Sequence, residues 1–197
     1  MNDPPMTSPD LNALRRWPNV PACYGWLSLD RRGQWRLRGE TVSHRGLNDF
    51  LNQRYAYDAV GNHFVQNGPQ RVYVELEYTP WIVHLSSAET LTTHVGSIVE
   101  RLERVLIDDQ GNLLFETDCG IALLCDRDLP FFIDRLHNES GEPASEQAVL
   151  AAIDHGTVDE LHLEWQSRRL PLHAIRRQEV PRHYRFIPTP QPPDARS

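Results

Sequence analysis

The stretch that decides the fold is LSLDRRGQWRL, residues 27–37, because it can be laid onto a second stretch, VLIDDQGNLLF, residues 105–115. In both, an Asp and a Gly stand three positions apart between two apolar runs. This spacing is typical of a β-turn in which the Asp side chain caps the backbone and Gly takes the last position. The sequence therefore predicts two β-hairpins that belong to an internal repeat.

Each hairpin is followed by a further apolar run and then by a segment with helical spacing of its apolar residues. We predict one helix capped by Ser43 and a second that starts at Asp128. A third helix should begin at Ser145 and end at Gly156, and a last hairpin should turn at Ser167-Arg168. The predicted fold class is α+β: two similar units of antiparallel β-hairpin plus strand plus helix, with a C-terminal helix and β-hairpin.

The same patterns predict how the chain is divided. Its Pro-rich, polar C-terminal end is typical of a segment without a packed core. The expected parts are an N-terminal extension with a short helix, 1–22; a first α+β unit, 23–86; a second α+β unit, 87–137; a C-terminal helix and hairpin, 138–187; and a disordered tail, 188–197.

The composition of the chain limits the class of protein to which it can belong. The chain has 197 residues, of which 40% are hydrophobic, and this suits one large or two small domains. No stretch approaches the about 20 apolar residues of a membrane-spanning helix, and the first residues lack the pattern of a signal peptide. Three cysteines without a CxxC pair indicate free thiols in a reducing compartment. We therefore expect a cytoplasmic protein with no membrane partner.

The charged residues exclude further classes of ligand and partner. All 20 basic residues are arginine, which excludes a Schiff-base lysine and the lysine of a phosphate-binding P-loop. The net charge is −7, and residues 87–160 hold 16 acidic and 4 basic side chains. Most of this surface would repel a polyanion, so we expect no nucleic-acid partner.

Part of the chain resembles a known family. The residues that carry the likeness are the hairpin, strand and helix of the first unit, then Pro69, Val72, Val74, Glu75, Pro80 and Trp81, and the run Thr92-Thr93-His94-Val95-Gly96. Over roughly Cys23 to His137 the chain is similar to a bacterial family of domains of unknown function. The resemblance implies a structure built from two repeated α+β motifs and a role in signal transduction. It supplies no catalytic residues.

A candidate ligand site lies at the connection between the two units. His84 and His94 flank this connection, and an arginine and two aromatic residues are close to it in the sequence. A groove lined by aromatic and Arg side chains suits a small anionic ligand, which a guanidinium can hold in a bidentate manner. The predicted ligand-binding residues are Arg71, Tyr73, Trp81, His84 and His94. The alternative is that they are ordinary side chains of a sheet face.

A candidate metal site lies in the last hairpin. With a turn at Ser167-Arg168, His162 stands opposite His173 and beside Glu164. Imidazole and carboxylate groups on one sheet face can converge on a divalent ion. The alternative is a solvated polar face.

No motif in the sequence indicates a particular enzymatic reaction. The nucleophile elbow Gly-x-Ser-x-Gly and the Gly-rich loops that bind nucleotides are absent, so we predict no catalytic residues and no cofactor. The leading hypothesis is a non-enzymatic protein that binds a small ligand or a protein partner in signal transduction. One alternative is a small hydrolase or metal-assisted enzyme that uses the His-bearing sheet faces. Another is a structural or interaction module that forms a homodimer.

Overall fold

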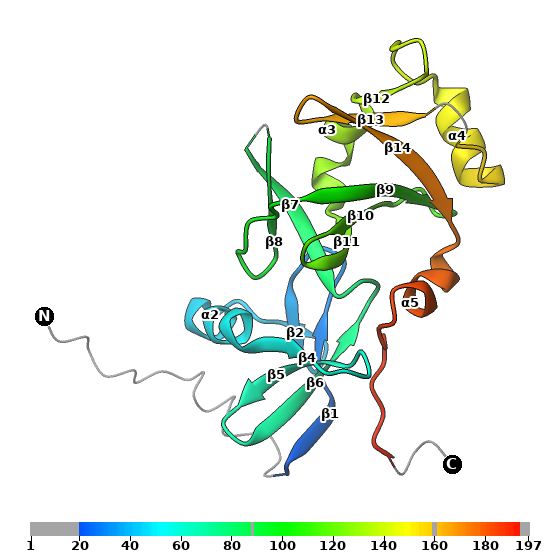
Figure 1. The fold of residues 1–197 in the computed structure, drawn as a ribbon. Helices are drawn as coiled ribbons and strands as arrows, with labels where there is room; N and C mark the ends of the chain where they lie inside the picture. The colour runs from blue at the N-terminus through cyan, green and yellow to red at the C-terminus, as the bar shows by residue number, and fades with distance from the viewer. Residues whose placement is uncertain (1–19, 88, 159–160, 194–197) are drawn as a thin grey trace, which may run out of the picture.

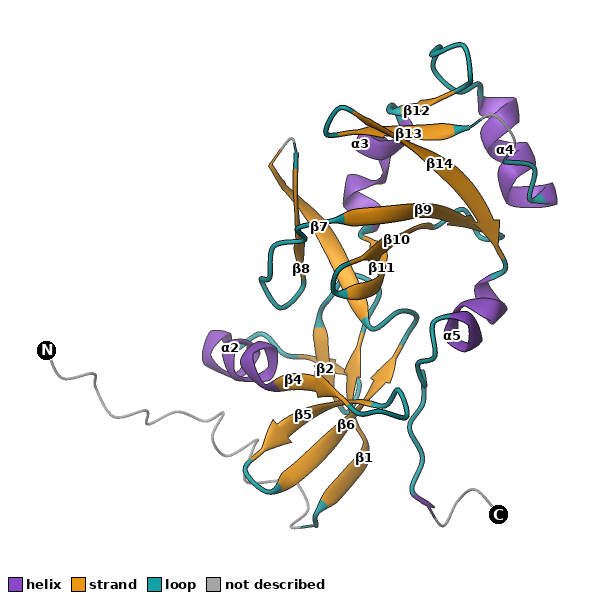
Figure 2. Ribbon diagram, in the orientation of Figure 1, coloured by secondary structure: helices purple, strands orange, loops and turns teal. Residues whose placement is uncertain are grey.

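A computed structural model describes residues 20–87, 89–158 and 161–193. Within them the chain forms two mixed β-sheets with short helices packed against them (Figures 1 and 2). The predicted α+β class is confirmed. The short helix expected near the N-terminus lies outside the described residues. No helix in the described ranges is both long enough and apolar enough to cross a membrane.

The first sheet has six strands in the order β3-β2-β1-β6-β5-β4. β1 and β6 pair in parallel, so this sheet is mixed and not wholly antiparallel as predicted. Its helix is capped by His44, whose Nδ1 accepts the backbone N–H of Leu47, rather than by Ser43. The elements are β1 Ala22–Leu29, β2 Trp35–Leu37, β3 Glu40–Thr41, α2 Arg45–Arg54, β4 Tyr55–Tyr57, β5 His63–Asn67 and β6 Gln70–Leu76.

The second sheet has eight strands in the order β12-β13-β14-β9-β10-β11-β7-β8. The helix predicted between Ser145 and Gly156 is confirmed as α4, Glu146–His155. The Ser145 hydroxyl accepts the N–H of Ala148, and Gly156 ends the helix with φ +67°. The elements are β7 Trp81–Ser87, β8 Thr90–Thr93, β9 Leu102–Asp108, β10 Leu113–Thr117, β11 Gly120–Leu124, a 3-10 turn Asp126–Asp128, α3 Leu129–Ile133, β12 Leu136–His137, α4 Glu146–His155, β13 His162–Trp165 and β14 Arg168–Ile175.

The two sheets share a strand order. Read from one edge, β3-β2-β1-β6-β5-β4 corresponds position by position to β11-β10-β9-β14-β13-β12. The parallel pair of the first sheet, β1 with β6, has its counterpart in β9 with β14. β7 and β8 extend the second sheet beyond β11, to which β7 pairs in parallel. The C-terminal hairpin is thus part of the second sheet.

The matching Asp and Gly residues form matching turns. Asp30 N–H donates to the Gln34 carbonyl and Gly33 N–H to the Asp30 carbonyl, each at 3.0 Å. Asp108, Gly111 and Asn112 make the same two bonds, also at 3.0 Å. Gly33 and Gly111 both have φ +76°, a left-handed conformation that glycine adopts without a Cβ penalty. The local geometry predicted from the Asp/Gly spacing is confirmed in both hairpins.

Two hydrophobic cores result. The first combines residues of the first sheet with one face of the second, where Leu106, Leu114 and Leu123 lie. The second core lies on the opposite face, where Val105, Ile107 and Phe115 alternate with them. The central strands β9, β10 and β11 of the second sheet therefore contribute to a core on each face, and the first core joins the two sheets.

The chain returns to the first sheet at its C-terminal end. We call residues 176–193 the strap; it contains a 3-10 turn, Arg177–Glu179, and α5, Val180–His183. Val180 and Phe186 belong to the first core. Ile187 N–H donates to the Gly61 carbonyl at 2.9 Å, and Leu76 N–H donates to the Pro188 carbonyl at 2.7 Å. The part of the expected disordered tail that the structure describes, 188–193, thus begins with a main-chain bond to β6.

Candidate functional site

A pocket of about 340 Å³ lies where the two sheets meet. The β1–β2 turn and Glu77 form its first side, and the second sheet forms the other side with Asn112 and Asp126. Leucines of the second sheet and of α3 form its apolar lining. The residues that line it are Asp30, Arg31, Arg32, Arg36, Glu77, Asn112, Leu113, Leu123, Leu124, Asp126 and Leu129.

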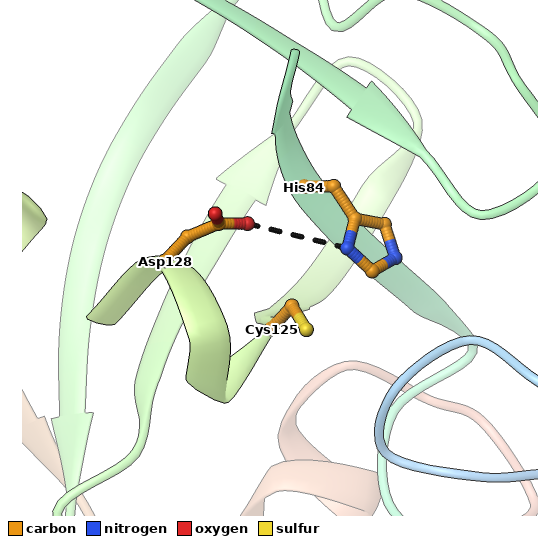
Figure 3. A group of neighbouring side chains, drawn as sticks. All are labelled: His84, Cys125 and Asp128. Carbon is orange, nitrogen blue, oxygen red and sulfur yellow. Dashed lines mark ion pairs between the residues drawn. The ribbon is translucent and has the colours of Figure 1, made fainter. Parts of the chain in front are cut away.

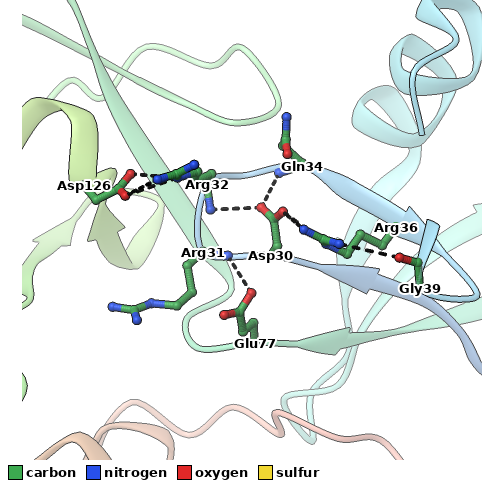
Figure 4. A network of polar contacts seen from close by, with 8 residues as sticks. All are labelled: Asp30, Arg31, Arg32, Gln34, Arg36, Gly39, Glu77 and Asp126. Carbon is green, nitrogen blue, oxygen red and sulfur yellow. Dashed lines mark hydrogen bonds and ion pairs between the residues drawn. The ribbon is translucent and has the colours of Figure 1, made fainter. Parts of the chain in front are cut away.

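We call this cavity the seam pocket, because it lies at the contact, or seam, between the two sheets. The β1–β2 turn positions its charged side chains. The Asp30 carboxylate accepts the backbone N–H groups of Arg32, at 2.9 Å, and Gln34, at 2.8 Å. These bonds fix the turn from which Arg31 and Arg32 project (Figure 4). The turn is also closely packed: a Cβ added at Gly33 would lie 2.6 Å from His94 Cβ. The arginines therefore start from a rigid backbone.

Two of the three arginines in the pocket are neutralised. Arg32 and Asp126 form an ion pair with Nη2 and Oδ2 at 2.6 Å, and hydrogen bonds to Arg32 lower the pKa of Asp126. Arg36 Nη2 lies 3.0 Å from Asp30 Oδ2. Both side chains of the Arg32–Asp126 pair are about half exposed, at 52% and 56%, so the pair adds little stability.

Arg31 differs from its two neighbours. Its Nη2 donates to the neutral side-chain oxygen of Asn112, across the seam. Its Nε is buried and has no hydrogen-bond partner in the described structure. Its backbone N–H, and not its guanidinium, donates to Glu77 Oε2 at 3.2 Å. In Figure 4 the Arg31 side chain extends from the turn away from Arg36. A partly buried guanidinium thus faces the pocket without a carboxylate partner among the described residues.

The structure brings together Trp81 and His94 of the predicted ligand site. Their ring centroids are 5.8 Å apart, and His94 also contacts Trp35 and Tyr55 at 5.5 and 5.3 Å. The His94 Nε2 atom is buried without a partner, and burial lowers the pKa of His94 to about 3. These rings form an aromatic cluster against the β1–β2 turn.

Arg71 and Tyr73 lie apart from that cluster. Both alternate along β6 with the buried Val72 and Val74, so they project from the opposite face of the first sheet. The Arg71 guanidinium lies 4.6 Å from the centroid of the Phe64 ring, and Tyr73 stacks on Tyr24 with centroids 4.4 Å apart. The five residues therefore do not line one groove.

A second buried histidine was not among the predicted residues. His63 on β5 is 5% exposed and tilts against Tyr55 and Tyr57. Its Nδ1 has no partner in the described structure, and burial lowers its pKa to about 4. The ring is therefore neutral near pH 7.

The predicted metal residues of the last hairpin lie in a different register. The hairpin turns at Gln166-Ser167, so His162 pairs with Pro171 and not with His173. The expected register is wrong by two residues, because this sequence lacks the Asn-Gly that marks such turns. His162 Nε2 lies 3.9 Å from Glu164 Oε1, and its strand partner on the other side is His137. His162 and His173 both line a separate pocket of about 660 Å³.

A different group of side chains, next to the seam pocket, places potential metal-ligand atoms close together. His84, Cys125 and Asp128 each offer one atom, and these atoms all lie within 4.8 Å of one another. Burial lowers the pKa of His84 and raises that of the Cys125 thiol. Of the three, only His84 was predicted from the sequence as a ligand-binding residue, whereas Asp128 was predicted as the start of a helix.

Sequence reasoning missed the residues of both sites for an identifiable reason. Arg31 and Arg32 lie at the tip of a turn that was assigned a purely structural role. Cys125 and Asp128 stand three apart at the end of an apolar strand, and this spacing was a usable signal for a turn with two ligands. Asp126, the partner of Arg32, is 94 residues away from it and meets it where the two sheets contact each other. His84 is distant in sequence from Cys125 and Asp128, and the β7–β11 pairing brings it close to them.

A family model described as "Protein of unknown function (DUF2946)" matches residues 6–191. No curated protein matches. The chain is similar in structure to a DUF1285 family protein from Silicibacter pomeroyi DSS-3, with 13% identity over 81% of this chain and 84% of that one and a TM-score of 0.50. A DUF1285 family protein from Shewanella baltica OS155 matches with 12% identity over 53% and 87% and a TM-score of 0.40.

Proposed function

We propose that this chain, which belongs to the family of unknown function DUF2946, binds a small anionic ligand in the seam pocket. The observation that carries the proposal is the Arg31 guanidinium, which lines the pocket with a buried, unpartnered Nε. A buried donor without an acceptor costs about 1–3 kcal/mol. A carboxylate or phosphate oxygen in the pocket would remove this cost and supply the opposite charge.

The size and lining of the pocket support this class of ligand. Its volume of about 340 Å³ lies at the lower end of the range for small-molecule sites. Its leucines offer an apolar surface, and Asn112 and Arg31 offer polar contacts from both sides of the seam. A small molecule with an apolar body and one acidic group fits this combination.

We propose that the position of the pocket between the two sheets serves signalling. We interpret the shared strand order as an internal repeat, with the pocket at the contact between its two copies. A ligand oxygen that accepts from Arg31 Nε binds the same guanidinium whose Nη2 donates to Asn112, so its binding is coupled to a bond between the two sheets. Such a coupling of ligand to sheet contact is how we propose that the protein takes part in signal transduction.

The proposal is tested by thermal shift against a panel of small carboxylates and phosphate esters, with inorganic phosphate included. At least one compound should raise the melting temperature. Its dissociation constant, measured by titration calorimetry, should rise at least about tenfold in Arg31→Gln, since a hydrogen bond to a charged group contributes about 1.5–3 kcal/mol. The matched control is Arg45→Gln, because the Arg45 side chain is 96% exposed at the start of α2.

Binding that is equally tight in Arg31→Gln and in the wild type contradicts the proposal. So does a panel in which no anion raises the melting temperature.

A further inference from the structure

Strand pairing brings His84, Cys125 and Asp128 together. β7 and β11 are parallel, with Leu124 opposite Val83, so the next residues along each strand, Cys125 and His84, are also neighbours. Asp128 follows one 3-10 turn later. In Figure 3 its carboxylate faces the His84 ring and the Cys125 thiol lies below the gap between them. His84 Nδ1 and Asp128 Oδ2 are 4.0 Å apart.

Backbone bonds hold the three side chains in place. Cys125 N–H donates to the Val83 carbonyl at 2.9 Å, and Asp128 N–H donates to the Cys125 carbonyl at 3.0 Å. Asp128 precedes α3 but does not cap it; its carboxylate instead accepts the N–H of Leu85 at 3.0 Å. Bonds of this kind orient metal ligands in known sites.

The His84 ring is oriented from its other side. Its Nε2 lies 3.3 Å from the position that a Cβ would take at Gly33, so this edge faces the β1–β2 turn. The Arg32 backbone in that turn acts on the ring and partly offsets the lowering of the His84 pKa by burial. The Nδ1 atom is therefore the one directed toward Asp128 and Cys125, as a ligand would be.

We propose that His84, Cys125 and Asp128 bind a zinc ion. A thiolate, an imidazole and a carboxylate are all zinc ligands, and the thiolate disfavours magnesium and calcium. In a tetrahedral site with metal–ligand distances of about 2.0–2.3 Å the ligand atoms stand about 3.3–3.6 Å apart. The observed separations, all within 4.8 Å, need only a small inward movement of the side chains.

No fourth ligand belongs to this group among the described residues, so the proposed site leaves one position open. Zinc takes four ligands, and the chain supplies three in this group. The His84 side chain is 35% exposed and that of Asp128 is 22% exposed, so solvent can reach the ion. Three protein ligands with one exchangeable position are typical of zinc sites that bind water or a small molecule. Asp126, which lines the seam pocket, has Oδ1 3.5 Å from Cys125 Sγ, so the two sites are adjacent.

The test uses cobalt(II) as a spectroscopic probe and zinc as a competitor, with reduced, chelator-treated full-length protein. The wild type should bind one cobalt ion and show a sulfur-to-cobalt charge-transfer band together with the intense visible bands of a tetrahedral site. One equivalent of zinc should remove both. Cys125→Ser should lose the charge-transfer band, and Asp128→Asn should bind at least about tenfold more weakly. Asn at this position keeps an oxygen for the Leu85 N–H, so it retains the local fold.

The matched control is Cys119→Ser, since Cys119 is a partly exposed free thiol in a turn of the same sheet. It should keep the full spectrum. The proposal is overturned if the wild type shows no charge-transfer band, if Cys125→Ser keeps it, or if Cys119→Ser loses it. It is also overturned if Asp128→Asn, with a wild-type circular dichroism spectrum, binds cobalt as tightly as the wild type. Arg31→Gln should leave cobalt binding unchanged, so failure of the anion proposal does not decide this one.

Discussion

His63 is a neutral ring fixed among aromatic side chains. It is 5% exposed on β5, and burial lowers its pKa from 6.5 to about 4. The unfolded chain therefore takes up a proton at this residue as the pH falls below 6.5, whereas the folded chain does not until about pH 4. His63 therefore stabilises the folded state at pH values above 6.5 compared with acidic pH. This contribution to the free energy of unfolding is lost as the pH falls from 6.5 to about 4.

We predict that the free energy of unfolding falls between pH 6.5 and pH 4, with His63 contributing about 3 kcal/mol of the decrease. In His63→Gln the decrease should be smaller, because Gln does not titrate. Urea denaturation at a series of pH values measures this. The control is His155→Gln, since His155 is exposed at the end of α4. Equal slopes for the wild type and His63→Gln would contradict the prediction.

At the scale of elements, the strap depends on Gly61. This residue lies in the β4–β5 turn with φ +94°, and an added Cβ would stand 2.2 Å from the Arg185 carbonyl oxygen. The Gly61 carbonyl in turn accepts the N–H of Ile187. The atom in the way is main chain, so the strap has to move if a side chain is added.

We predict that Gly61→Ala destabilises the protein more than Gly68→Ala. Gly68 also has positive φ, +56°, but an added Cβ would meet nothing within 4 Å. Both variants carry the backbone cost of about 1–2 kcal/mol, and Gly61→Ala adds about 1–3 kcal/mol for the displaced strap. Urea denaturation gives the difference, and trypsin should cleave at the strap arginines faster in Gly61→Ala. Equal stability and equal cleavage rates would show that the strap contact is not formed.

At the scale of the whole molecule, the first core makes the two sheets one folding unit. Leu114 is fully buried on β10, in the second sheet, yet it belongs to the core shared with the first sheet. A cavity at this position removes contacts from both sheets at once. The sheets should therefore not unfold separately.

We predict that Leu114→Ala lowers the free energy of unfolding by about 2–5 kcal/mol and leaves a single transition in calorimetry. Hydrogen exchange should accelerate in β5 of the first sheet as well as in β13 of the second. Leu150→Ala is the control, because this leucine is 49% exposed on α4. Two separate transitions, or faster exchange in one sheet alone, would contradict the shared core.

Local signals predicted local structure. The Asp30/Gly33 and Asp108/Gly111 turns, and the helix between Ser145 and Gly156, follow from a few neighbouring residues. The parallel pairings β1–β6, β7–β11 and β9–β14 join strands that are distant in sequence, and no local pattern marks them. The seam pocket depends on such pairings. A pocket between two halves could be expected, but Arg31 and Asp126 could not be assigned to it.

The last hairpin shows why a face can be predicted when a register cannot. The actual pairing differs from the expected one by two residues, and a shift of two keeps each side chain on its own face. Leu163, Trp165, Leu170 and Leu172 are therefore buried as expected. The relation of His162 to His173 depends on the exact register, so the shift changed it.

The strap also constrains the order of folding during synthesis. Ribosomes deliver the first sheet early, but Val180 and Phe186, which complete the core beneath it, emerge about a hundred residues later. Until then the nascent first sheet exposes apolar surface that the finished protein covers. A chaperone bound to the growing chain would find its target here, and release would coincide with arrival of the C-terminal residues.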